Sequence, residues 1–244
     1  MTKKIVPVFL LVAICFSMLF SCKKYNNAKV DATRNYFPLT LHNYVVYNVD
    51  STYYHGIAGT QAHVASQIMY SVSDTFTDSK KRPSYIMNVY VRPYDGAVWQ
   101  ASSVILITPT ATGLLYSQDG TQYLKMIFPV NDSTSWAGNQ YAEVNDASFA
   151  FLKGWNYQYQ DMHHSYFNGN VNYDNTVTVL EDDENVNYQN VDSLVSGYRT
   201  YAKEVYAYNV GMVYKEWTHY TWGSPDTAND KNGYRVIMSA VANH

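Results

Sequence analysis

From Tyr36 onward, apolar and polar residues alternate along the chain with a period of two. The segment Ser84–Arg92 shows the pattern, because its apolar residues share one face: Tyr85, Met87, Val89 and Val91. Further segments repeat it: Val64–Val72, Leu124–Phe128, Val177–Val179 and Tyr234–Ala240. A period of two is that of a β-strand, in which successive side chains point to opposite faces of the sheet. The pattern therefore predicts strands along most of the chain.

Turn dipeptides separate these segments, namely Asp95-Gly96, Asp119-Gly120, Asn168-Gly169 and Asn232-Gly233. Such pairs accept the positive φ angles that a two-residue hairpin turn requires, so consecutive strands should be antiparallel. We expect an all-β, largely antiparallel sandwich or lipocalin-like barrel of about ten strands. One segment departs from the pattern, since Leu194, Tyr198 and Tyr201 are spaced as on a helix face. A short helix near 192–199, followed by a strand from about 201, is the expectation there.

The N-terminus predicts export and lipid attachment. A short basic start precedes an apolar run over 5–20, which is shorter than the ~20 residues of a transmembrane helix. Leu19, Ser21 and Cys22 resemble the bacterial lipobox, although Phe20 is bulkier than is usual at its position. The resemblance implies a signal peptide over 1–21, cleavage before Cys22 and lipid attachment to the Cys22 sulfur.

Three regions follow from these patterns. Residues 1–21 are the signal peptide, 22–35 are the lipidated cysteine and a polar, flexible tether, and 36–244 form a single β domain. A faint internal similarity between Phe37-Pro38 and Phe128-Pro129, each followed by an aromatic residue, suggests two similar halves of that domain. Chance similarity is the alternative explanation.

Composition and charge narrow the class of protein. The chain is 47% hydrophobic and 15% charged, which is typical of a folded domain and excludes a disordered polymer. Removal of 1–21 takes away Lys3, Lys4 and Cys15, which leaves 15 Lys+Arg against 20 Asp+Glu, a net charge of −5, and no cysteine pair for a disulfide. This acidic balance argues against nucleic acid as a partner. The 25 tyrosines favour sheets with partly wet faces.

Candidate chemistry is sparse. The sequence has no Gly-x-Ser-x-Gly elbow, phosphate-binding glycine loop or His-Glu-x-x-His motif, so we predict no catalytic residues, no cofactor and no metal. Asp161 and His163 could share a strand face, but two ligands are too few for a metal site. The Asn170–Glu181 segment spaces its oxygen donors like a calcium loop, although Asn175 replaces the usual glycine. A solvated hairpin end is the alternative interpretation of that segment.

The strongest candidate for ligand binding is an aromatic face. Trp155, Tyr157 and Tyr159 alternate with Asn156, Gln158 and Gln160. Coplanar aromatic rings could form a platform on which a sugar ring or an extended apolar ligand stacks. The alternative is that this face belongs to the hydrophobic core.

Short stretches of the mature chain also resemble a family. The elements 37–39 (FPL), 128–130 (FPV) and 206–216 (YAYNVGMVYKE) are similar to those of uncharacterised outer-membrane lipoproteins of the Bacteroidota. This resemblance implies an all-β extracytoplasmic domain and carries no known activity. The expected function is a lipid-anchored, non-enzymatic binding or structural module of the cell envelope. The alternatives are a glycan- or lipid-processing enzyme with carboxylates from distant strands, and an accessory subunit of an envelope assembly.

The expected location is the outer membrane, with the lipid as the contact to the membrane. Lys23 and Lys24 follow the cysteine where a surface-export signal would be acidic, which favours the periplasmic face over the cell surface. A glycan, a lipid or an envelope protein is the expected kind of partner.

Overall fold

The alternating segments pair into one antiparallel sheet in the computed structural model, which describes residues 31–244 except 57–59, 143, 145–148, 190–194 and 224–230. Its strands are β1 (Tyr44–His55), β2 (Thr60–Thr77), β3 (Pro83–Arg92), β4 (Gln100–Pro109), β5 (Gly113–Gln118), β6 (Thr121–Ile127), β7 (Ser135–Trp136), β8 (Tyr157–Phe167), β9 (Asn172–Gln189), β10 (Val195–Ala207), β11 (Gly211–Gly223) and β12 (Lys231–Asn243), with the 3₁₀ helices η2 (Ala32–Tyr36) and η4 (Ala150–Leu152). The all-β, antiparallel prediction is confirmed, with twelve strands in the described residues instead of about ten. In that same part of the chain, no helix has the length and apolar character needed to cross a bilayer.

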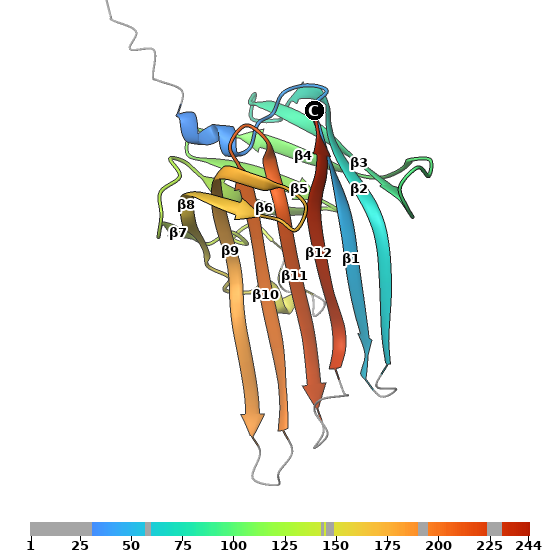
Figure 1. Cartoon of the computed structure of the whole chain (residues 1–244). Coiled ribbons are helices and arrows are strands. Elements are labelled where there is room, and N and C mark those ends of the chain that lie inside the picture. Colours follow the sequence, from blue (N-terminus) through green and yellow to red (C-terminus); the bar gives the residue numbers. More distant parts are fainter. Residues whose placement is uncertain (1–30, 57–59, 143, 145–148, 190–194, 224–230) are drawn as a thin grey trace, which may run out of the picture. The chain divides into compact units, whose positions relative to one another are not determined.

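The sheet consists of two consecutive meanders, β1–β6 and β7–β12, which meet where β1 pairs with β12. Figure 1 shows these two strands side by side, although they are the first and last strands of the sequence. Tyr44 and His244 exchange both backbone hydrogen bonds at 3.1 Å, which fixes the start of β1 to the end of the chain. The sheet order is therefore β6-β5-β4-β3-β2-β1-β12-β11-β10-β9-β8-β7.

Side chains join the two ends of the sheet and turn it into a nearly closed barrel. The Trp136 indole donates to the Leu124 carbonyl at 2.8 Å, and the Leu124 amide donates to the Gly138 carbonyl at 2.8 Å. The Tyr159 hydroxyl accepts from the Ile127 amide at 3.0 Å and donates to the Ile127 carbonyl at 2.8 Å. Tyr159 thus takes the place of a neighbouring strand for one residue of β6. We call this junction the seam.

The turn chemistry is confirmed in part. Asp119 and Gly120 adopt φ angles of 50° and 80° between β5 and β6, as the sequence predicts. Asn232-Gly233 is not a turn, because both residues lie inside β12. Gly233 adopts a φ of 146°, and a Cβ there would stand 2.2 Å from the His219 carbonyl oxygen. This glycine therefore allows close approach of β11.

The predicted helix near 192–199 is wrong where the structure describes it. Residues from Val195 onward belong to β10, which pairs along its length with both β9 and β11. Pairing on both edges uses the backbone groups of β10, and this outweighs the helical spacing of its tyrosines. Residues 190–194 lie outside the described part of the chain.

The end of the predicted tether is also corrected. Residues 31–35, assigned to the tether, are packed on the barrel together with the fully buried Tyr36. Arg34 donates to the carbonyls of Thr110 and Ala111 at 2.9 and 2.7 Å, and the Thr33 hydroxyl accepts from the Val130 amide at 3.0 Å. Thr33 and Arg34 thus have hydrogen-bond partners on the barrel, which hold this segment in place. Cys22 and the signal peptide lie outside the described residues.

Candidate functional site: a buried charge cluster below a pocket

Four charged side chains from four strands meet inside the barrel. The Lys125 ammonium on β6 donates to one oxygen each of Glu181 on β9 and Glu204 on β10, both at 2.7 Å. Lys215 on β11 donates to the same Glu204 oxygen, Oε1, at 2.9 Å. The Tyr206 hydroxyl donates to the other oxygen of Glu204. We call Lys125, Glu181, Glu204 and Lys215 the charge cluster, whose formal charge is zero.

Two members of the cluster lie at β-bulges. On β6, Leu124 and Met126 pair with successive residues of β5, so Lys125 is an extra residue. On β9, Leu180 and Asp182 likewise pair with successive residues of β10, so Glu181 is extra. A bulge can redirect a side chain that strict alternation would send to the other face. The bulge on β6 lets Lys125 and its neighbour Met126 both be buried, whereas Glu181 already alternates with the buried Val177 and Val179.

The pairing register of β10 and β11 places the other two members of the cluster, Glu204 and Lys215. Glu204 and Lys215 are direct cross-strand partners on β10 and β11, so their side chains lie on the same face of the sheet. Glu204 is only 1% exposed. Its carboxylate accepts hydrogen bonds from three donors, which satisfies most of the acceptor sites of this buried charge.

Burial and charge act against each other on the pKa values in the cluster. Burial raises the pKa of Glu204, but the ammonium groups of Lys125 and Lys215 outweigh it and hold that pKa below its usual value. Burial, together with the charge of Glu204, raises the pKa of Glu181 despite Lys125. Burial lowers the pKa of Lys125, whereas Glu181 and Glu204 raise it further, so the ammonium stays charged. Burial likewise lowers the pKa of Lys215, whereas Glu204 raises it further, so this ammonium also stays charged.

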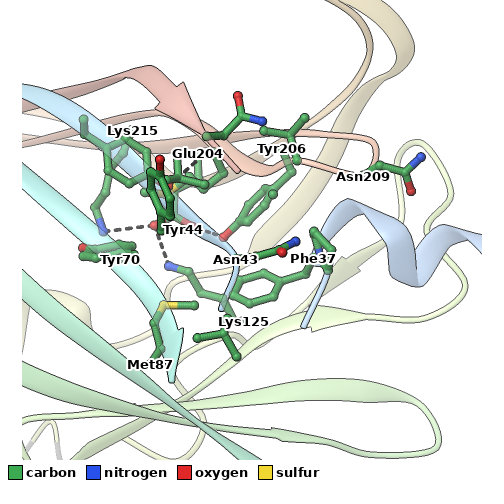
Figure 2. Close-up of a pocket in the computed structure, with 18 of the residues that line it drawn as sticks. Phe37, Asn43, Tyr44, Tyr70, Met87, Lys125, Glu204, Tyr206, Asn209 and Lys215 are labelled. Atoms are coloured by element: carbon green, nitrogen blue, oxygen red, sulfur yellow. Dashed lines mark hydrogen bonds and ion pairs between the residues drawn. The ribbon is translucent and has the colours of Figure 1, made fainter. Parts of the chain in front are cut away.

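A pocket with a volume of about 80 Å³ lies above the cluster at the end of the barrel. Lys125, Glu204 and Lys215 contribute to its lining, and Figure 2 shows these three side chains close together, with Phe37, Tyr44 and Tyr70 around them. The remaining lining residues are Pro38, Asn43, Val45, Tyr47, Val72, Met87, Tyr116, Tyr206, Asn209, Val210, Gly211, Met212, Asn243 and His244. Most of these are aromatic or aliphatic, so the pocket combines an apolar wall with a charged floor.

The tyrosines around the floor are neutral hydrogen-bonding groups. Burial raises the pKa of Tyr47, Tyr70 and Tyr116, and nearby Glu204 adds to this effect. The Tyr47 hydroxyl donates to the Met212 carbonyl at 2.9 Å and so holds one wall in place. These rings present apolar surface to the pocket without adding charge.

The three predicted platform residues lie elsewhere. Trp155, Tyr157 and Tyr159 are 5%, 2% and 0% exposed and belong to the hydrophobic core. Their polar atoms have partners in the protein, since Tyr157 donates to Asn139 at 2.9 Å and Trp155 donates to the Phe151 carbonyl at 2.7 Å. Stacking needs an exposed ring face, and the core covers these rings. The structure therefore supports the core interpretation, with Tyr159 closing the seam.

The calcium-loop interpretation is corrected as well. Asn172 onward is strand β9, and Glu181, the expected bidentate ligand, is buried in its ion pair with Lys125. Asn170 remains outside on the turn and donates its amide to Asn168. A paired strand cannot wrap its side chains around an ion as a loop does. In the described ranges, no group of three or more His, Cys, Asp or Glu side chains is arranged to hold a metal ion.

Sequence reasoning missed the charge cluster. Its members lie up to 90 positions apart (125 to 215) and follow no motif. Glu181, Glu204 and Lys215 each have a charged neighbour in the sequence, so nothing singles them out. The available signal was that a charge between apolar neighbours, such as Lys125 between Leu124 and Met126, needs a partner if a bulge turns it inward.

Comparisons with known proteins find similarity only among solved structures. One is a presumed exported protein with a YmcC-like fold from Bacteroides fragilis, at 10% identity and a TM-score of 0.39, covering 84% of this chain and 98% of that one. Another is a presumed lipoprotein from Parabacteroides distasonis, at 14% identity and a TM-score of 0.28, with the same coverage of both chains. No protein-family model matches the sequence, and no curated protein matches it.

Proposed function

We propose that the chain is a lipid-anchored, non-enzymatic binding module of the cell envelope, which takes a small ligand into the pocket above the charge cluster. The observation that carries the proposal is a partly apolar pocket whose floor holds charged side chains at the end of a barrel. Stability alone does not require such a floor, because well-packed apolar residues in place of buried ion pairs are often neutral or stabilising. A few polar groups in an apolar pocket are typical of ligand sites.

The hydrogen bonds in the cluster support a non-enzymatic role. Both oxygens of Glu204 already accept hydrogen bonds, from Lys125 and Lys215 on one and from Tyr206 on the other. A carboxylate in this arrangement is held as a structural anion. A nucleophile or general base needs an oxygen that can reach the substrate.

The enzyme alternative has two observations in its favour. The bonded oxygens of Glu181 and Glu204 both lie 2.7 Å from the same nitrogen, so they are at most twice that, 5.4 Å, apart. Carboxyl groups about 5–5.5 Å apart are typical of retaining glycosidases. Their pKa values are also shifted in opposite directions, as in acid and nucleophile pairs. The ammonium of Lys125 occupies the position between them, where such an enzyme places the sugar.

The test of the binding module uses the methionine methyl groups as reporters. Met87 and Met212 line the pocket, whereas Met69 does not. The purified chain in detergent, labelled with ¹³C at methionine methyl groups, is titrated with butyrate, butyramide and butylammonium up to millimolar concentrations. We expect at least one of the three to shift the Met87 and Met212 signals and to leave Met69 unchanged. No shift with any of them contradicts the proposal.

A pocket-filling variant sharpens this test. Asn43 lines the pocket. Asn43→Trp should therefore fill the pocket and abolish the shifts, and a thermal melt establishes that the variant is folded. The enzyme alternative is tested separately with a panel of aryl glycosides and aryl esters: hydrolysis that is lost in Glu204→Gln would favour it.

Attachment to the envelope rests on the sequence. Lipidation at Cys22, the outer membrane as location and its periplasmic face are parts of the same proposal, supported by the lipobox and by Lys23 and Lys24. A glycan, a lipid or an envelope protein would then be reached from the membrane by a domain on a short tether.

A further inference from the structure

We infer that the pocket binds a small organic carboxylate, with the Lys215 ammonium as the group that recognises it. This inference rests on the proposed function and adds the chemical class of the ligand. It follows from which hydrogen-bonding groups of the floor are already used and which are not.

The hydrogen-bond acceptors on the pocket floor already have donors within the protein. Glu204 accepts from Lys125, Lys215 and Tyr206, and it is the carboxylate side chain that lines the pocket. Glu181, the other carboxylate of the cluster, is not part of the lining. A ligand that brings hydrogen-bond donors, such as an amine, would meet a carboxylate whose oxygens already have partners.

Some hydrogen-bond donors on the pocket floor have no acceptor within the described part of the protein. An ammonium group has three N–H bonds. Lys215 spends one of them on Glu204. Its nitrogen also lies 5.0 Å from the Trp217 ring and interacts electrostatically with Lys125, Glu181 and Tyr70, without a further hydrogen bond to any described residue. Its side chain keeps 19% of its surface exposed, against 9% for Lys125. Lys215 can therefore offer two N–H groups to a ligand that accepts hydrogen bonds.

The residues of the pocket walls determine which kind of ligand can fit beside the charged head group. Phe37, Tyr44, Tyr70, Val72 and Met87 contribute apolar surface around the floor. A volume of about 80 Å³ accommodates roughly five to eight water-sized groups, since each needs about 10–15 Å³ by this measure. A short aliphatic chain with a carboxylate head fits both the size and the polarity. Its two oxygens would accept from Lys215 while its chain packs against the rings.

The discriminating experiment compares isosteric ligands. Butyrate, butyramide and butylammonium have nearly the same shape but carry a negative charge, no charge and a positive charge. We expect butyrate to bind at least about tenfold more tightly than the other two in the Met87 and Met212 methyl titration. Equal binding of butyramide, or tighter binding of butylammonium, overturns the carboxylate assignment and leaves the binding module intact. No binding of any of the three overturns both.

Variants identify the recognising group. Lys215→Met should reduce butyrate affinity about tenfold or more and leave butyramide affinity unchanged, and Lys215→Arg should retain most of the preference for butyrate. Lys203→Met is the matched control, because Lys203 neighbours Glu204 on β10 but contacts the rings of Tyr201 and Tyr214 and does not line the pocket. Thermal melts establish that each variant is folded. Unchanged butyrate binding in folded Lys215→Met would refute the role of Lys215.

Discussion

Replacing Lys125 by methionine tests the energetics of the charge cluster most directly. Methionine keeps the length and apolar stem of the side chain but removes the ammonium that donates to Glu181 and Glu204 at 2.7 Å. Glu204 retains Lys215 and Tyr206, whereas Glu181 loses its ammonium partner. The main cost is therefore the uncompensated charge of buried Glu181.

The expected magnitude follows from that charge. Breaking a buried ion pair by removing one partner costs about 3–5 kcal/mol. The pKa of Glu181 is already raised by burial and by Glu204, and without Lys125 it should rise further, so the group can escape part of the cost by taking up a proton. We expect a loss of about 3 kcal/mol at pH 7. The loss should be smaller at pH 5, because a raised folded-state pKa favours the folded state as the pH falls.

Urea unfolding followed by tryptophan fluorescence measures this loss, with the free energy extrapolated linearly to water. The double variant Lys125→Met/Glu181→Leu removes the stranded charge and should recover most of the stability, to within about 1 kcal/mol of the parent. Lys203→Met, outside the cluster, should cost about 0.5 kcal/mol or less. A single-variant loss below about 1 kcal/mol, or a double variant no more stable than the single one, would refute the reasoning.

Three further predictions concern the seam, the partly buried Asp182 and the anchor. Tyr159→Phe leaves the Ile127 amide and carbonyl without their partner and should lower the unfolding free energy by about 1–3 kcal/mol, while Tyr201→Phe serves as the control; an unchanged denaturation midpoint would count against the seam. Burial, with the charges of Glu184 and Asp183, raises the pKa of Asp182 from 3.8 to about 6, so the parent should lose stability from this group as the pH rises through that interval. Asp182→Asn should flatten that part of the stability profile, measured by urea midpoints from pH 4 to 7, whereas Asp183→Asn, which removes one of the two charges that raise the pKa of Asp182, should flatten it only in part. Cys22→Ser should leave an uncleaved precursor that takes up no labelled palmitate, and persistent labelling would contradict the lipobox interpretation.

The strands and several turns were predictable because their causes are local. Alternation along Ser84–Arg92 and the φ preferences of Asp119-Gly120 depend on residues close together in sequence. The same local reasoning failed at Asn232-Gly233, where the glycine serves a close approach of β11 and not a turn. It also failed at 31–35, whose polar residues read as a tether until their partners on the barrel are known.

The charge cluster was not predictable for a specific reason. Alternation sends Lys125 to the face opposite Leu124 and Met126, and only the bulge against β5 brings it inward. Glu181 alternates with the buried Val177 and Val179, but its partner Lys125 lies on a distant strand that a single sequence does not identify. A bulge is fixed by the register of the partner strand, which a single sequence does not reveal. Alternation did place Trp155, Tyr157 and Tyr159 on one face, but it could not show whether other parts of the chain cover that face.

Closure of the barrel and construction of the pocket depend on the same strand. Lys125 lies on β6, the end strand of the first meander, and its carboxylate partners lie on β9 and β10 of the second. The ion pairs therefore act across the seam that Tyr159 closes through Ile127, two residues further along β6. Because Lys125 also contributes to the pocket floor, the floor exists only when the two meanders are held together. Of the three hydrogen bonds to Glu204, the one from Lys125 thus depends on how this sheet closes, whereas those from Tyr206 and Lys215 come from its own strand and the adjacent one.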